Sequence, residues 1–79
     1  MRILFFAQLK DVTKCDFVEW DLASPLDAGQ LWASLLKQFP ALAAHRASVR
    51  LAKNGEYATG DAEFGNDDEA ALIPPVSGG

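Results

Sequence analysis

The sequence predicts an α+β fold in which one helix packs across one face of a mixed β-sheet. Two observations carry this prediction: a segment with the periodicity of an amphipathic helix, and two segments with the pattern of β-hairpins on either side of it. The chain has 79 residues, which is enough for one domain. It contains no internal repeat or low-complexity segment.

The first hairpin is predicted from two apolar segments near the N-terminus. Arg2 to Ala7 form a short run rich in strand formers. Phe17 to Leu22 alternate between apolar and acidic residues, which is typical of a half-buried strand. The polar segment between them, LKDVTKCD at residues 9–16, is expected to form a hairpin turn or a short loop.

The helix is predicted from its N-terminal signals and an apolar stripe. Ser24 occupies the place of an N-cap, Pro25 the first helical position, and Asp27 follows the serine at the spacing of a capping box. Pro40 ends the helix, and ALAAHR at residues 41–46 is expected to add a short helical turn. The stripe recurs at helical spacing and consists of Ala28, Leu31, Trp32, Leu35, Leu36 and Phe39.

The second hairpin is predicted around Asn54-Gly55, because both residues tolerate positive φ and favour a tight turn. One strand precedes this dipeptide and a short strand returns after it. A polar turn then leads to a last strand from about Glu69 to Ile73. The predicted order is ββαββ, and the pattern leaves room for one more short strand. If the first and last strands pair side by side, they run parallel.

Charge and cysteine content exclude several classes of protein. The formal net charge is −4 and the cationic residues are scattered, which disfavours nucleic acid, since such binding depends on Lys and Arg that neutralise phosphates. The single cysteine, Cys15, cannot form an internal disulfide, so a reducing compartment is expected. The apolar start MRILFFAQL is too short for a signal sequence or a membrane span. We therefore expect a cytoplasmic protein that binds neither nucleic acid nor membrane.

One face of the predicted sheet has nothing in the chain to cover it. Arg2 and Glu69 are charged and should face water, which sets the phase of the alternation in both strands. Small monomers rarely expose a clustered apolar patch unless it binds a partner. A register slip or a bulge would instead bury both sets of side chains. The apolar residues that the alternation places on this face are Leu4, Phe6, Ala71 and Ile73.

The chain ends in PPVSGG, which we interpret as an extended tail, residues 74–79, beyond a domain of residues 1–73. Pro74 and Pro75 cannot donate backbone hydrogen bonds, so they stop the last strand and favour an extended chain. Gly78 and Gly79 lack a Cβ, so the walls of a narrow channel on another protein could close around their backbone. An ordinary frayed terminus is the alternative.

The reactive group of such a tail is the α-carboxylate of Gly79. Adenylation by ATP would make one carboxylate oxygen part of a leaving group, and a thiol, persulfide or amine could then attack the carbonyl carbon. Attack by sulfur would give a thiocarboxylate that carries one sulfur atom. The sequence offers no acid–base pair, metal site or activated nucleophile of its own. We therefore expect a carrier that binds no cofactor or metal.

The chain resembles the small subunit of molybdopterin synthase, the MoaD-type sulfur carriers. The resemblance rests on ILFFAQL at residues 3–9, the helix after Ser24-Pro25, and ALIPPVSGG at residues 71–79, and it covers essentially the whole chain. It implies a ubiquitin-like β-grasp fold, with a mixed sheet of four to five strands and one main helix. It also implies that an ATP-dependent activating enzyme adenylates Gly79 and that a sulfur donor system forms the thiocarboxylate. The sulfur would then pass to cyclic pyranopterin monophosphate, in the synthesis of the molybdenum cofactor.

The resemblance also implies roles for individual residues. Gly79 would carry the sulfur, Gly78 would give clearance, and Phe6 and Ile73, together with Leu4 from the alternation, would contact the large synthase subunit. Catalytic groups are expected on that subunit, and the family suggests two copies of each. Family members often have an aromatic residue in place of Ile73, so docking is expected to depend more on Phe6. The remaining tail residues expected in the channel of the partner are Pro74, Pro75, Val76 and Ser77.

Two other functions share the activated carboxylate. A sister carrier supplies sulfur for thiamin thiazole, although LFFAQ and PPVSGG favour the molybdopterin branch. A ubiquitin-like modifier would instead join Gly79 to lysines of other proteins. Neither Cys15 nor His45 lies in a catalytic or metal-binding motif. The acidic segment DAEFGNDDE, residues 61–69, lacks the ligand spacing of a calcium loop; it is interpreted as a solvated turn, or as a surface that meets a basic partner.

Overall fold

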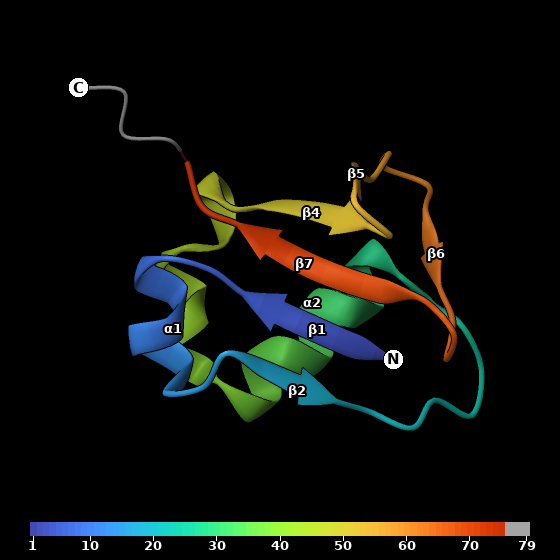
Figure 1. The fold of residues 1–79 in the computed structure, drawn as a ribbon, viewed down its shortest axis with the longest axis horizontal. Coiled ribbons are helices and arrows are strands. Elements are labelled where there is room, and N and C mark those ends of the chain that lie inside the picture. Colours follow the sequence, from blue (N-terminus) through green and yellow to red (C-terminus); the bar gives the residue numbers. More distant parts are fainter. Residues whose placement is uncertain (76–79) are drawn as a thin grey trace.

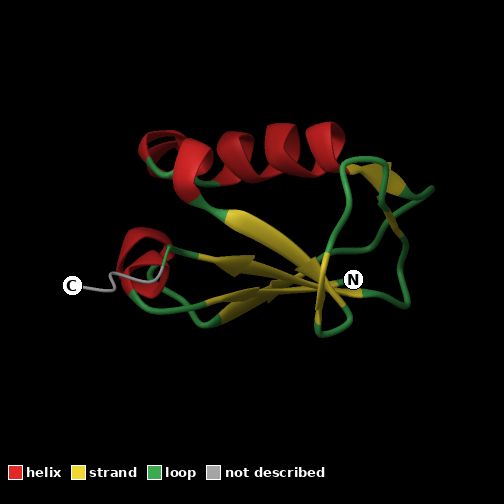
Figure 2. Ribbon diagram, turned by 90° about the horizontal axis from the view of Figure 1, so that it is seen from above, coloured by secondary structure: helices red, strands yellow, loops and turns green. Residues whose placement is uncertain are grey.

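A five-stranded mixed sheet forms one layer of the fold, and helix α2 packs across one of its faces (Figures 1 and 2). The computed structural model describes residues 1–75. The parallel pair β1–β7 lies at the centre of the sheet, and its other neighbouring strands are antiparallel. These features confirm the predicted fold class and the pairing of the first and last strands. In sheet order the strands are β2 (Phe17–Glu19), β1 (Arg2–Phe5), β7 (Glu69–Ile73), β4 (Arg50–Lys53) and β5 (Glu56–Tyr57).

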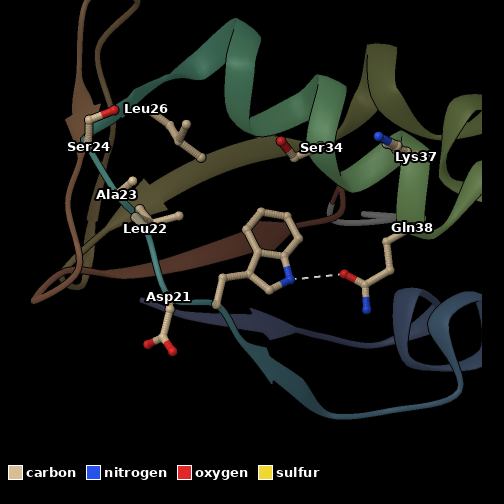
Figure 3. A pocket seen from close by; sticks show the side chains of 9 residues that line it. Asp21, Leu22, Ala23, Ser24, Leu26, Ser34, Lys37 and Gln38 are labelled. Atoms are coloured by element: carbon tan, nitrogen blue, oxygen red, sulfur yellow. Dashed lines mark hydrogen bonds between the residues drawn. The ribbon is translucent and has the colours of Figure 1, made fainter.

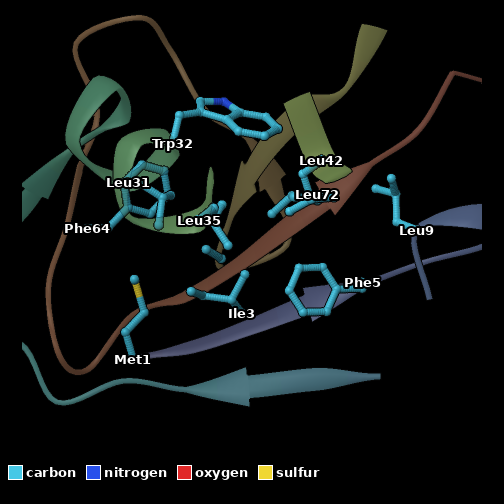
Figure 4. Close-up of a cluster of buried hydrophobic side chains, with 11 residues drawn as sticks. Met1, Ile3, Phe5, Leu9, Leu31, Trp32, Leu35, Leu42, Phe64 and Leu72 are labelled. Carbon is cyan, nitrogen blue, oxygen red and sulfur yellow. The ribbon is translucent and has the colours of Figure 1, made fainter. Parts of the chain in front are cut away.

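The core lies between α2 (Ala28–Gln38) and the sheet. The predicted stripe turns inward: Leu31, Trp32 and Leu35 are buried, while Leu36 and Phe39 are partly buried at its edge. Figure 4 shows Leu31, Trp32 and Leu35 on the side of the sheet from which the side chains of the two central strands face them. Burial of this apolar area is the main term that stabilises so small a domain. The buried residues of the central strands are Ile3, Phe5, Ala70 and Leu72.

The start of α2 differs from the prediction. The helix begins at Ala28, and its N-cap is Asp27 rather than Ser24. The Asp27 Oδ1 accepts a hydrogen bond from Gln30 N at 2.8 Å, and the Gln30 Oε1 accepts one from Asp27 N at 3.0 Å. This reciprocal capping box satisfies two N–H groups at once. Pro25 precedes strand β3 (Leu26–Asp27), which pairs with β6 (Glu63–Phe64) and buries Phe64 against the core.

The prediction of a turn or loop at residues 9–16 is also wrong, because this segment contains helix α1 (Gln8–Thr13). Leu9 and Thr13, one helical turn apart, are both buried. The Thr13 hydroxyl donates to the Leu9 carbonyl at 3.0 Å, so its burial leaves no unpaired polar atom. Lys14 ends the helix in the left-handed region, with a φ of 64°.

The remaining connections agree with the sequence. Two 3₁₀ turns, η1 (Pro40–Ala44) and η2 (Arg46–Ser48), follow α2 where a short helical turn was predicted. Asn54 and Gly55 join β4 to β5 with φ values of 52° and 87°, which confirms the tight hairpin. No helix within residues 1–75 has the length and apolarity needed to cross a bilayer.

Asp68 ties the second hairpin to the loop before β7. Its carboxylate accepts hydrogen bonds from Gly65 N at 2.7 Å and from Asn54 Nδ2 at 2.9 Å, and Lys53 Nζ lies 3.8 Å away. The Asn54 Oδ1 in turn accepts from Glu69 N at 2.9 Å. The Gly65 hydrogen bond first, and then that of Asn54, lower the pKa of Asp68 below its ordinary value. This carboxylate therefore has a structural role within the acidic segment.

We predict that Asp68 stabilises the fold above about pH 5 and that this contribution is lost on acidification. The pKa of Asp68 is lowered in the folded state, so the folded state binds its proton less readily than the unfolded chain does. The free energy of unfolding of Asp68→Asn should be lower than that of the wild type at pH 7. The difference in unfolding free energy between the wild type and Asp68→Asn should shrink as the pH falls through the pKa of Asp68 in the folded state. Urea unfolding at a series of pH values measures this difference.

The matched control for this experiment is Asp67→Asn, because Asp67 is exposed and has no side-chain hydrogen bond among the described residues. The free energy of unfolding of Asp67→Asn at pH 7 should stay close to that of the wild type, because the change removes no side-chain hydrogen bond among the described residues. If the difference in unfolding free energy between the wild type and Asp68→Asn instead stays constant from pH 7 to acidic pH, that result would contradict a stabilising role for the ionised Asp68 carboxylate.

Candidate functional site

The sheet face opposite α2 carries an exposed apolar surface, which we call the outer face. We define it by Leu4, Phe6, Ala52, Tyr57, Ala71 and Ile73, which line a shallow hollow of about 410 Å³ together with Gly55 and Glu69. Leu4 pairs with Ala71 across the central strands, and Ala52 pairs with Ala71 from the other side. The alternation predicted from Arg2 and Glu69 is therefore confirmed, and neither a register slip nor a bulge occurs.

Large exposed apolar side chains gather on this side of the sheet. Among the described residues they are Phe6, Phe17 and Tyr57, with exposed fractions of 41%, 46% and 58%. Phe17 pairs with Leu4 and Tyr57 pairs with Ala52, so both extend the surface laterally. A clustered apolar surface of this kind marks a binding site for another molecule. Tyr57 was not predicted from the sequence as a residue of this surface, although alternation across the Asn54-Gly55 turn places it opposite Ala52.

The backbone turn after β1 sets the position of Phe6. Ala7 adopts a φ of 52° and a ψ of −130°, a conformation that costs a residue with a side chain about 1–3 kcal/mol. Lys10 N donates to the Ala7 carbonyl at 3.1 Å, and Leu9 N donates to the Phe6 carbonyl at 3.0 Å. This strained turn redirects the chain from β1 into α1, with Phe6 on the surface between buried Phe5 and buried Leu9.

The predicted tail starts at the edge of the outer face. Strand β7 ends at Ile73, and Pro74 and Pro75 follow it, the first half-buried and the second exposed. Figure 1 shows the chain leaving the sheet from the end of β7. Val76, Ser77, Gly78 and Gly79 lie outside the described residues, so the roles assigned to them remain predictions.

A second hollow, of about 450 Å³, lies on the helical side, between α2 and the segment from Trp20 to Leu26 (Figure 3). The indole Nε1 of Trp20 donates to the Gln38 Oε1 at 2.9 Å across it. This hydrogen bond ties the segment to the helix. The charged side chains that line the hollow are Asp21 and Lys37, and they form no ion pair with each other in the described part of the chain. Within residues 1–75 there is no group of three or more His, Cys, Asp or Glu side chains able to hold a metal ion.

Comparisons with known proteins identify relatives over the whole chain. A family model described as the ThiS family matches residues 3–79. The molybdopterin synthase sulfur carrier subunit of Arabidopsis thaliana is 34% identical over 100% of this chain and 82% of its own length. The structure of SAMP1 from Haloferax volcanii superposes with a TM-score of 0.81, at 29% identity over 100% of this chain and 98% of that one.

A further solved structure shares the fold at lower identity. It is a complex of subunits 1 and 2 of the molybdopterin-converting factor from Helicobacter pylori. The matching chain has a TM-score of 0.65 and 21% identity, over 99% of this chain and 96% of that one. Together these likenesses confirm the ubiquitin-like β-grasp fold.

We predict that neighbouring phenylalanines on opposite sides of the sheet differ in their contribution to stability. Phe5 is 1% exposed and Phe6 is 41% exposed. Phe5→Ala should lower the free energy of unfolding by about 3–5 kcal/mol, because it opens a cavity in the core. Phe6→Ala should lower it by about 1 kcal/mol or less. Urea unfolding measures both, and equal losses would contradict the assignment of the two faces.

Proposed function

This chain belongs to the ThiS family, as a MoaD-type sulfur carrier, and from that premise we propose that it is the small subunit of a molybdopterin synthase. The main support for the proposal is the outer face, an apolar surface suited to docking. Strand β7 contributes to this surface and leads directly into the tail. The domain would dock through this surface, and the tail would present Gly79 to the active site of the partner.

The proposed chemistry takes place at the α-carboxylate of Gly79. A carboxylate oxygen attacks the α-phosphorus of ATP on an activating enzyme, which releases pyrophosphate and leaves an acyl-adenylate. Hydrosulfide supplied by a donor system then attacks the carbonyl carbon and displaces AMP, and the products are a thiocarboxylate and a proton. The carrier itself binds neither ATP nor another cofactor, because the activating enzyme holds the nucleotide.

The second half of the proposed cycle takes place on the large subunit. A tail of six residues, fully extended, reaches roughly 20 Å, far enough to enter a channel beyond the docking surface. The thiocarboxylate sulfur adds to an electrophilic carbon of cyclic pyranopterin monophosphate there, which forms a thioester. Water then cleaves the bond between this sulfur and the Gly79 carbonyl carbon, so that the sulfur stays on the pterin and the Gly79 carboxylate is restored. The complex of two subunits in the Helicobacter pylori structure supports a partner of this kind.

A second candidate function, protein modification, is favoured by one observation. SAMP1 from Haloferax volcanii, a small archaeal modifier protein, is 29% identical to this chain over its whole length. In that case the amino group of a lysine, rather than sulfur, would attack the adenylated Gly79. Isopeptide-linked conjugates in cells, with no sulfuration of the pterin, would favour modification over sulfur transfer. A carrier for thiamin thiazole is the remaining alternative within the family.

We predict that deletion of Gly79, or Gly78→Phe, abolishes sulfur transfer without unfolding the domain. Deletion removes the reacting carboxylate from its place, and a phenyl ring at residue 78 blocks a channel fitted to a bare backbone. The wild type and the chain that lacks Gly79 are incubated with the activating enzyme, ATP and the sulfur donor. Intact-mass analysis should then show exchange of one oxygen for sulfur in the wild type and no such exchange in the deletion variant. Gly78→Phe should fail at transfer to the precursor.

The control for these tail variants is thermal unfolding. All three chains should share one transition temperature, because the buried residues of the described core belong to residues 1–72 and neither change alters them. Wild-type sulfur transfer by the chain that lacks Gly79 would contradict the proposed role of the terminus, and loss of the transition would show that the tail is structural.

We predict that Phe6→Ser weakens binding to the large subunit by about 30-fold or more, as expected for a buried aromatic anchor at an interface. Isothermal titration calorimetry measures the Kd. Ala33→Ser, an exposed change on α2, is the control and should leave the Kd unchanged. Equal affinity of Phe6→Ser and Ala33→Ser would contradict docking through the outer face.

A further inference from the structure

Arg50 is held at the point where the tail leaves the sheet. It begins β4 and pairs with Ile73, the last residue of β7. Its guanidinium carbon lies 4.1 Å from the centroid of the Tyr57 ring, which is 58% exposed. Arg50 therefore belongs to the rim of the outer face, beside the start of the tail.

The other arginine on this side of the sheet, Arg2, already has a carboxylate partner. Its Nη2 lies 2.8 Å from Glu19 Oε1, and its Nε donates to the same oxygen at 3.2 Å. Arg50 has neither an ion pair nor a side-chain hydrogen bond with any residue in the range 1–75. Its cross-strand neighbour is the apolar Ile73. The two arginines thus lie at opposite ends of the sheet; Arg2 is paired with a carboxylate, and Arg50 has no carboxylate partner among residues 1–75.

The stack on Tyr57 prepares Arg50 for a planar anion. Stacking uses the face of the guanidinium and leaves its in-plane N–H donors at the edge. Because the ring restrains the side chain, less conformational entropy is lost when the donors bind. Five donors in a fixed fork match the two oxygens of a carboxylate.

We infer that Arg50 binds a carboxylate side chain of the large subunit at the entrance of the channel that receives the tail. This inference rests on the proposed function, since it requires the outer face to dock on that subunit. The chain carries a net charge of −4, so its overall field repels an acidic surface and the contact must be local. Apolar burial alone is non-directional. A bidentate contact beside Ile73 fixes the orientation of the domain and aligns the tail with the channel.

The test compares Arg50→Met with Arg46→Met. Arg46 also lies over an aromatic ring, with its guanidinium carbon 5.7 Å from the centroid of Trp32 in α2, on the helical side of the sheet. Both variants lose one positive charge from a guanidinium that lies over an aromatic ring. Calorimetric Kd values for the purified large subunit are measured in about 50 mM and about 500 mM NaCl, where Debye lengths differ roughly threefold.

Arg50→Met should raise the Kd about tenfold at low salt, with a clearly smaller ratio at high salt. Arg46→Met should stay within about twofold of the wild type at both salt concentrations. Arg50→Lys should fall between the wild type and Arg50→Met, because an ammonium keeps the charge but not the fork. Equal Kd values for Arg50→Met and Arg46→Met would overturn the inference.

Phe6→Ser separates this inference from the function on which it rests. If Phe6→Ser weakens binding and Arg50→Met does not, the outer face docks and the inference about Arg50 is wrong. If neither change alters the Kd, or if the wild type forms no complex, both the docking mode and the role of Arg50 fail. Thermal unfolding of the free variants should be alike, which excludes misfolding as the cause of a weaker Kd.

Discussion

The parallel pairing of β1 with β7 is the constraint on which both surfaces of the sheet depend. Its register sets Ile3 beside Ala70 and Phe5 beside Leu72 under α2, and Leu4 beside Ala71 on the opposite side. A slip of one residue in either strand would exchange the two sets. One interaction therefore specifies the core and the docking surface together. It also brings the end of β7, and with it the start of the tail, next to Phe6 from the N-terminal strand.

In the proposed function, the folded domain provides a docking surface and the tail provides the reacting group. The core stabilises a sheet whose outer face supplies apolar contact area. Charged and hydrogen-bonded groups lie around that face: Arg2 with Glu19 at one end, and Arg50 over Tyr57 at the other. In the proposed function the domain places one carboxylate, that of Gly79, where two other proteins act on it in turn. SAMP1 from Haloferax volcanii has the same fold.

The sequence was sufficient to predict which side chains of β1 and β7 face the core, since Arg2 and Glu69 mark the solvent side of each strand. It was also sufficient for the Asn54-Gly55 hairpin, because positive φ at both residues is a local property. It was insufficient where structure depends on distant partners. Strand β3 is two residues long and exists because Leu26 pairs with Phe64. Helix α1 was not predicted, because its two buried residues lie within an otherwise polar segment. Tyr57 belongs to the outer face because it pairs with Ala52 of β4, and β4 pairs with β7.

The central claim is that the partner binds the side of the sheet that α2 leaves open. Methyl-selective NMR of the labelled chain, titrated with unlabelled large subunit, measures this directly. Binding there should shift or broaden the methyl resonances of Leu4, Ala71 and Ile73, while those of Leu22 and Leu26 beside α2 keep their positions. Changes confined to Leu22 and Leu26, with the outer-face methyl groups unaffected at saturation, would contradict it.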